Sequence, residues 1–279
     1  MVCLDLCAAC RSLPTWHIAV TDDTPPYLWQ RNDRTKPYRR GQRLGSRVPP
    51  LRTSSMLWDL PSERISERSR SSLRRLTFGV YFDSPVEDIL WPDSLQKLSF
   101  GFSFNQPIER ANWPASLQEL SFGVGFNQPV GGVNWPVSLR RLTFGVCFDH
   151  PIHKTRWPDC LQHLTFGVRF NQPIHQISWP ALLQELAFGN DFNQPIHAVV
   201  WPPRLQRLTF GVRFDQPIQG VVWPPGLRRL EFGVLFDQPI DGVVWPESLE
   251  NLTFGFRFNQ AIDRVVWPAG LQSLTLGSK

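Results

Sequence analysis

Apolar residues recur along residues 73–279 with a period of 22 residues. Leucine opens each period, and we number the positions of a unit from it. The opening leucines are Leu73, Leu95, Leu117, Leu139, Leu161, Leu183, Leu205, Leu227, Leu249 and Leu271. In the nine complete units, leucine also occupies position 4, phenylalanine positions 6 and 10, and Trp-Pro positions 19 and 20. A fixed period without insertions is typical of repeat proteins, in which each unit is one supersecondary element.

Within a unit, the pattern predicts a short strand followed by turns. The segment "LTF" at residues 164–166 alternates apolar and polar side chains, as a half-buried strand does. Proline at positions 13 and 20 excludes a long helix, because it lacks a backbone N–H and clashes with the preceding turn. Asn or Asp at position 11, before Gln-Pro, is typical of a turn. We therefore expect a mainly β solenoid of 22-residue coils with little or no helix.

The repeated side chains are expected to hold neighbouring coils together. Phe166, Phe170 and Trp179 should point inward and stack on their equivalents in the next coils. Asn171 should belong to a hydrogen-bonded ladder that satisfies the backbone of the turns. A lone coil cannot offset its loss of chain entropy, but burial of each large side chain against a neighbour contributes about 1.5–3 kcal/mol. The stability of the solenoid should then be the sum of contacts between each coil and its nearest neighbours.

The unit "LQHLTFGVRFNQPI" at residues 161–174 resembles the FNIP repeat, a relative of leucine-rich repeats, with "LxxLxF" in place of "LxxLxL". The resemblance covers residues 73–279 and implies a leucine-rich-repeat-like solenoid used for protein–protein interaction. Some relatives join such repeats to an F-box and act as substrate adaptors of ubiquitin ligases. Here the segment "LPSERISERSRSSL" at residues 60–73 starts like an F-box, but the helical pattern that should follow is missing.

The basic character of the chain belongs to its N-terminal part. Residues 1–72 contain 12 Lys and Arg against 7 Asp and Glu, whereas residues 73–279 contain 17 of each. A neutral repeat region argues against a large nucleic-acid surface. Residues 1–55 are rich in Arg, Ser and Pro and contain no Phe, so we expect a mostly disordered leader. Residues 56–72 are a candidate N-terminal cap for the solenoid that spans residues 73–279.

Three clustered cysteines raise the question of a metal site. Cys3, Cys7 and Cys10 have a spacing similar to that by which radical-SAM enzymes hold an iron–sulfur cluster, but no βα alternation follows them. Zinc would need a fourth ligand, for which His17 is the nearby candidate. A lipid anchor on these cysteines is a further alternative. We favour free cysteines and expect no metal and no cofactor.

Histidine recurs at position 15 in three consecutive units, as His153, His175 and His197. Stacked coils would place these residues in a column, where two imidazoles could share a metal or respond to pH. The alternative, which we favour, is a polar turn position that varies freely. No nucleophile with an adjacent base stands out, so we do not expect an enzyme.

The sequence also bears on the compartment. It shows neither a signal-peptide pattern at the N-terminus nor a run approaching the ~20 apolar residues of a membrane span. We therefore expect a cytoplasmic protein that does not bind a membrane.

The positions that vary between units are the candidates for function. Positions 3 and 9 should lie near each other on the strand face, and several carry arginine, a residue favoured in interfaces. The arginines expected to contact a partner are Arg75, Arg141, Arg207 and Arg229 at position 3, with Arg169 and Arg213 at position 9. The sequence thus predicts a non-catalytic scaffold that binds an unknown protein partner along its strand face.

Three alternatives stay open. The first is the ubiquitin-ligase adaptor. The second is a regular-surface binder of nucleic acid or carbohydrate that uses the Thr/Ser row at position 5, although Ala187 and Glu231 interrupt that row. The third concerns assembly: Leu276 stands in a phenylalanine position and no polar cap follows it, so an open strand edge could allow end-to-end self-association.

Overall fold

The computed structural model describes residues 18–19 and 73–277 of the chain. Apart from Ile18 and Ala19, the expected leader and cap, residues 1–55 and 56–72, lie outside the described residues. Ile18 and Ala19 form the short strand β1 (Ile18–Ala19), which pairs antiparallel with the first strand of the repeats, Ile18 lying opposite Phe78.

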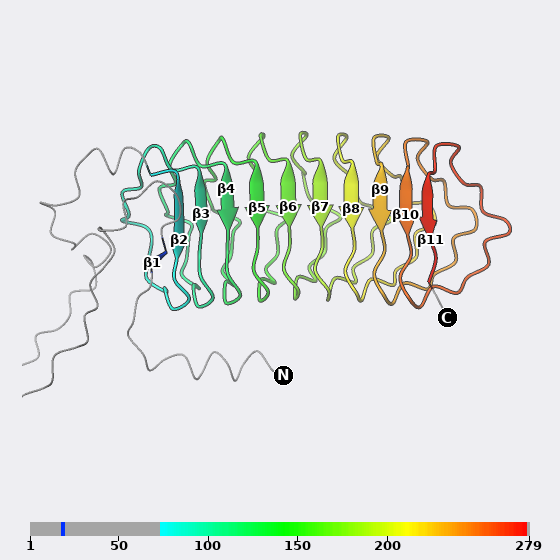
Figure 1. The fold of residues 1–279 in the computed structure, drawn as a ribbon, viewed down its shortest axis with the longest axis horizontal. Coiled ribbons are helices and arrows are strands. Elements are labelled where there is room, and N and C mark those ends of the chain that lie inside the picture. Colours follow the sequence, from blue (N-terminus) through cyan, green and yellow to red (C-terminus); the bar gives the residue numbers. More distant parts are fainter. Residues whose placement is uncertain (1–17, 20–72, 278–279) are drawn as a thin grey trace, which may run out of the picture.

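Each unit contributes one short strand to a single sheet, and the strands follow one another in sequence order (Figure 1). They are β2 (Arg75–Phe78), β3 (Lys97–Ser99), β4 (Glu119–Ser121), β5 (Arg141–Thr143), β6 (His163–Thr165), β7 (Glu185–Ala187), β8 (Arg207–Thr209), β9 (Arg229–Glu231), β10 (Asn251–Thr253) and β11 (Ser273–Thr275). Neighbours from β2 to β11 pair in parallel, with equivalent repeat positions opposite each other. Since the described residues contain no helix, the predicted mainly β solenoid is confirmed.

The core is a set of aromatic and aliphatic columns that run along the solenoid. Phe166 and Phe170 stack with their ring centroids 4.0 Å apart. Phe166 lies 5.7 Å from Phe188, its equivalent in the next coil, and Phe170 lies 6.2 Å from Phe192. Trp179 is partly buried and packs against the same core. Because each ring touches its own coil and both neighbours, no coil has a complete core by itself.

Glycine at position 7 sets how closely the coils approach. A Cβ atom at Gly167 would overlap the carbonyl oxygen of Gly145 in the preceding coil. The same overlap with the preceding glycine recurs at Gly123, Gly189 and Gly211. A side chain at this position is therefore incompatible with the spacing that the phenylalanine columns require.

The Asn/Asp residues of position 11 join consecutive turns. The backbone N–H of Asn171 donates to Oδ1 of Asp149 at 3.0 Å. In turn, Oδ1 of Asn171 accepts from the backbone N–H of Asn193 at 2.9 Å and from Nε2 of Gln194 at 3.0 Å. This arrangement satisfies donors of the turn that no strand partner reaches.

The last described coil is less buried than the others. Leu274 and Leu276 are 36% and 37% exposed, whereas Leu252, the equivalent of Leu274 in the preceding coil, is fully buried. No other described strand pairs with the outer edge of β11. Self-association through this edge stays a prediction.

Candidate functional site

Equivalent side chains of neighbouring strands lie side by side on the sheet, so they form rows that run across the strands. Position 4 of each strand points into the core, so positions 3 and 5 point outward. The register places Arg141 between Glu119 and His163, and Arg207 between Glu185 and Arg229. We define the strand face as these outward positions 3 and 5 together with positions 2 and 9, which flank each strand in the sequence.

The arginines predicted to bind a partner all lie on the strand face, but they differ in their contacts. Arg207 pairs with Glu185 of the preceding coil at 3.4 Å, and Arg213 pairs with Asp191 at 3.3 Å. Within the described part of the chain, Arg141, Arg169 and Arg229 form no ion pair. Arg75 is exposed at the start of β2. The three arginines without an ion pair are the ones whose charge is most available to another molecule.

Charge is distributed unequally between the strand face and the rest of the described repeats. The basic residues of the strand face are Arg74, Arg75, Lys97, Arg140, Arg141, Arg169, Arg207, Arg213, Arg228, Arg229 and Arg257; the acidic ones are Glu119, Glu185, Asp191, Glu231 and Glu250. Eleven basic and five acidic residues give this face a net charge of +6. The remaining surface of residues 73–277 has five basic and twelve acidic residues, a net charge of −7. The near-neutral total therefore combines a net positive strand face with a net negative remaining surface.

Some residues of this basic face were absent from the sequence prediction. Arg140 and Arg228 stand at position 2, just before the strands, and Arg257 stands at position 9. A count of charged residues at each repeat position, in place of one count over the whole repeat region, would have identified these three arginines from the sequence.

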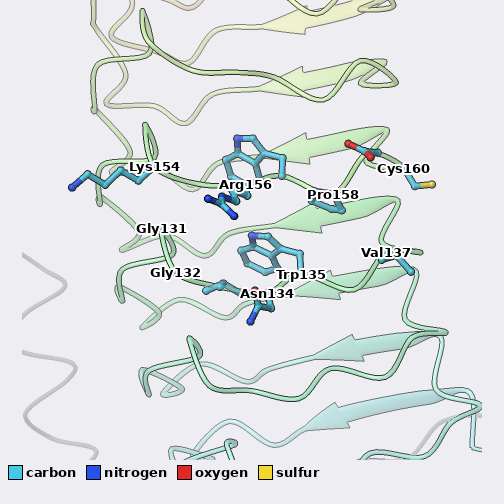
Figure 2. A pocket seen from close by; sticks show the side chains of 12 residues that line it. Gly131, Gly132, Asn134, Trp135, Val137, Lys154, Arg156, Pro158 and Cys160 are labelled. Carbon is cyan, nitrogen blue, oxygen red and sulfur yellow. The ribbon is translucent and has the colours of Figure 1, made fainter.

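The return segments, which run from the turn at position 11 back to the next strand, form a shallow pocket of about 670 Å³ around Trp135 and Trp157 (Figure 2). Gly131 and Gly132 leave it open because they carry no side chains at positions 15 and 16. The indole N–H groups of both tryptophans have no hydrogen-bond partner. Because they are buried, a ligand in the pocket does not reach them as donors. The cationic residues at the rim, Lys154 and Arg156, are exposed, and Figure 2 shows Lys154 extending away from the ring of Trp135.

The two cysteines of the repeats are also placed by the structure. Cys160 is exposed at the rim of this pocket, and Cys147 is half-buried at position 9 of the strand face. Neither lies in a group of three or more His, Cys, Asp or Glu residues able to hold a metal, since the described residues contain no such group. Cys3, Cys7, Cys10 and His17 lie outside the described residues.

The position-15 histidines are exposed. His175 and His197 line one pocket of about 370 Å³, together with Pro173 and Pro195. His153 occupies the equivalent position of the preceding coil but does not line this pocket.

Four valines at position 18 form an exposed row on the return segments. Val200, Val222, Val244 and Val266 are each 80–82% exposed. A pocket of about 640 Å³ lies between Val222 and Val244. The sequence prediction did not include this row, because it did not establish which side chains of the return segment point outward.

The described residues contain no helix long and apolar enough to cross a membrane.

Comparisons with known proteins agree on the repeat and its fold. The sequence model of the FNIP Repeat matches residues 91–125, 104–147, 148–191, 192–234 and 236–279. The solved structure of CroV588, described as a novel circular LRR protein, is similar at 34% identity over 74% of this chain and 40% of its own, with a TM-score of 0.50. The pneumococcal vaccine antigen PcpA is similar at 11% identity over 74% of this chain and 69% of its own, with a TM-score of 0.28. No curated protein sequence matches.

The chain spans less than half the length of the circular protein that it resembles. Solenoids of the leucine-rich-repeat type are typically binding scaffolds for other proteins, because stacked repeats form an extended surface.

Proposed function

This chain belongs to the FNIP repeat family, and we propose that it is a non-catalytic scaffold that binds a protein partner along its strand face. The observation that carries the proposal is the set of arginines on this face that form no ion pair within the described residues, Arg141, Arg169 and Arg229 among them. They stand where the repeats vary, whereas the residues that repeat are committed to packing and to the turn hydrogen bonds.

The geometry of the strand face supports such a role. Ten parallel strands hold their outward side chains in register, one coil apart, on a rigid sheet. Side chains fixed in this way lose little conformational entropy when a partner binds. Arginine suits this position because its planar guanidinium can form two parallel hydrogen bonds with one acceptor group.

Affinity capture with matched charge-reversal variants tests the proposal. The strand-face variant combines Arg141→Glu, Arg169→Glu and Arg229→Glu. The control variant combines Arg110→Glu, Arg156→Glu and Arg204→Glu, three exposed arginines on the remaining surface that likewise form no ion pair in the described part of the chain. Both variants change the net charge equally, so differences in capture report the face that was altered.

The full chain and both variants would be immobilised and the bound proteins identified by mass spectrometry. We expect proteins captured by the parent chain and by the control variant to be lost from the strand-face variant. Circular dichroism should show the same β signal for all three, because the substituted side chains lie outside the core. Capture of the same proteins by the strand-face variant would exclude the strand face as the binding surface.

A further inference from the structure

We infer that the partner of the strand face is an acidic protein segment, bound in extended form across several coils, whose carboxylates pair with the arginines of this face. This inference rests on the proposed function and adds the chemistry of the partner. It starts from the net charge of +6 on the strand face, against −7 on the remaining described surface of the repeats.

The carboxylates of the strand face are largely engaged by basic neighbours already. Glu119 pairs with Lys97 at 2.7 Å, and Glu250 pairs with Arg228 at 3.5 Å. Glu185 and Asp191 are engaged in the same way by arginines of the following coil. Of the five carboxylates, only Glu231 has no ion pair within the described residues.

These internal pairs leave a surplus of positive charge. The residues without an ion pair among the described residues are Arg74, Arg140, Arg141, Arg169, Arg229 and Arg257. The repeat does not supply enough carboxylates on this face to match them, so these arginines are available to complementary groups of another molecule. A partner that brings carboxylates offers the bidentate acceptor that a guanidinium prefers.

Apart from Arg74 in the first coil, the unpaired arginines lie in two groups along the solenoid. Arg140 precedes β5, Arg141 starts it, and Arg169 follows β6 in the next coil. Arg229 starts β9, and Arg257 follows β10. Adjacent strands are ~4.8 Å apart, so the coils of Arg141 and Arg257 are separated by about 24 Å. About seven or eight residues of extended chain span this distance, which allows one short segment to reach both groups.

A protein segment fits this surface better than a nucleic acid does. A phosphate backbone carries a charge at every nucleotide and is repelled by each carboxylate along its path. A strand that crossed from the first arginine group to the second would pass Glu185, Asp191 and Glu231. A peptide can place uncharged or basic residues opposite these carboxylates and acidic residues opposite the arginines. Proteins that bind single strands also use rows of exposed aromatic rings, and position 9 carries one aromatic residue, Tyr81, in the described coils.

The N-terminal part of this chain is not a suitable occupant. Residues 1–72 have 12 Lys and Arg against 7 Asp and Glu, so their net charge has the same sign as the strand face. Like charges repel, so these residues are a poor match for the strand face, and we infer that the complementary segment belongs to a different protein.

Fluorescence anisotropy with the full chain tests the inference. The probe is a fluorescein-labelled peptide of about ten residues with alternating Glu and Ser, long enough to cross both arginine groups. The same peptide with Gln in place of Glu is the neutral control, and a single-stranded oligothymidine of similar length represents nucleic acid. We expect the Glu peptide to bind, the Gln peptide not to bind, and the affinity for the Glu peptide to fall as salt is raised from low to physiological concentration.

The variants described above assign the binding to a face. The strand-face variant should weaken binding of the Glu peptide at least tenfold, whereas the control variant should change it less than about twofold. Equal binding of the Glu and Gln peptides, or equal loss in the two variants, would overturn the inference. Tighter binding of the oligothymidine than of the Glu peptide would overturn it in favour of a nucleic-acid partner.

Failure of this inference can be distinguished from failure of the proposed function. If affinity capture depends on the strand face but the Glu peptide does not bind, the scaffold function stands and its partner is not acidic. If capture does not depend on the strand face, the proposed function itself fails, and peptide binding then has no bearing on it.

Discussion

Oδ1 of Asn171 accepts a hydrogen bond from the backbone N–H of Asn193, 22 residues later, at 2.9 Å. The same oxygen accepts from Nε2 of Gln194. One side-chain atom thus joins two turns that share no strand hydrogen bond, and the contact recurs from coil to coil with Asp in place of Asn at several positions. The ladder needs only the acceptor oxygen Oδ1, which Asn and Asp both supply, and not the side-chain NH2 group of Asn.

Replacing Asn171 tests this ladder. We expect Asn171→Leu to lower the free energy of unfolding by about 1–3 kcal/mol, because the N–H of Asn193 loses its partner. The matched variant Asn171→Asp keeps the acceptor, as Asp149 and Asp237 do in their own coils, and should cost less than about 0.5 kcal/mol. Urea unfolding followed by circular dichroism measures both. Equal stability of the two variants would show that the ladder contributes nothing.

The glycine column should be intolerant of a single methyl group. Gly167→Ala would place a Cβ atom against the carbonyl oxygen of Gly145, and the backbone of neither coil can move without separating the phenylalanine columns. We expect a loss of at least about 3 kcal/mol. Gly226→Ala is the control, because its Cβ would meet nothing closer than 3.8 Å and its backbone does not require glycine. That variant should be unchanged or more stable by about 0.4–1 kcal/mol.

Thermal unfolding of the two glycine variants distinguishes these effects. A lower melting temperature for Gly167→Ala alone is the expected result. Similar melting temperatures for both variants would mean that neighbouring coils can move apart at position 7 to admit a methyl group with little loss of free energy of unfolding.

Thr155 interrupts a column of buried aliphatic side chains at position 17. It is 8% exposed, and its Oγ1 is buried without a hydrogen-bond partner, whereas Val133 and Ile177 occupy the same position in the neighbouring coils. We expect Thr155→Val to raise the free energy of unfolding by about 1 kcal/mol, because the substitution removes an unsatisfied hydroxyl and keeps the shape. Thr165→Val, at an exposed strand position, should have no such effect. Destabilisation by Thr155→Val in urea unfolding would contradict the assignment.

Adjacent valines on the return segment should respond in opposite ways. Val221 is 5% exposed and Val222 is 80% exposed. Val221→Ala removes two buried methyl groups and should cost about 2 kcal/mol, since each buried carbon contributes ~0.8 kcal/mol and a cavity remains. Val222→Ala should change stability by less than about 0.5 kcal/mol. Chemical denaturation of both variants provides the test, and equal losses would mean that Val222 is covered in solution.

The sequence is sufficient to predict the coil and its columns. An apolar residue that recurs every 22 positions must face the same side of every coil, so the repeat period alone predicts that Phe166 and Phe170 stack on their equivalents. The prolines exclude helices, and the regular spacing fixes a parallel register. These inferences succeed because the local pattern of each unit and the contact between units impose the same requirement.

The tertiary structure decides which surface each variable residue occupies. Strand alternation gives the direction of Arg141, but no regular period within a unit describes the return segments, and the packed coils show that Val221 is buried beside the exposed Val222. Likewise, a net charge of zero over the repeats suggests a neutral body, whereas the strand face carries most of the arginines and most carboxylates stand outside it. Sequence alone determined the coil because its hydrophobic spacing admits one way of stacking. The net charge of the strand face is evident only in the stacked coils, because that surface is assembled from residues 22 positions apart.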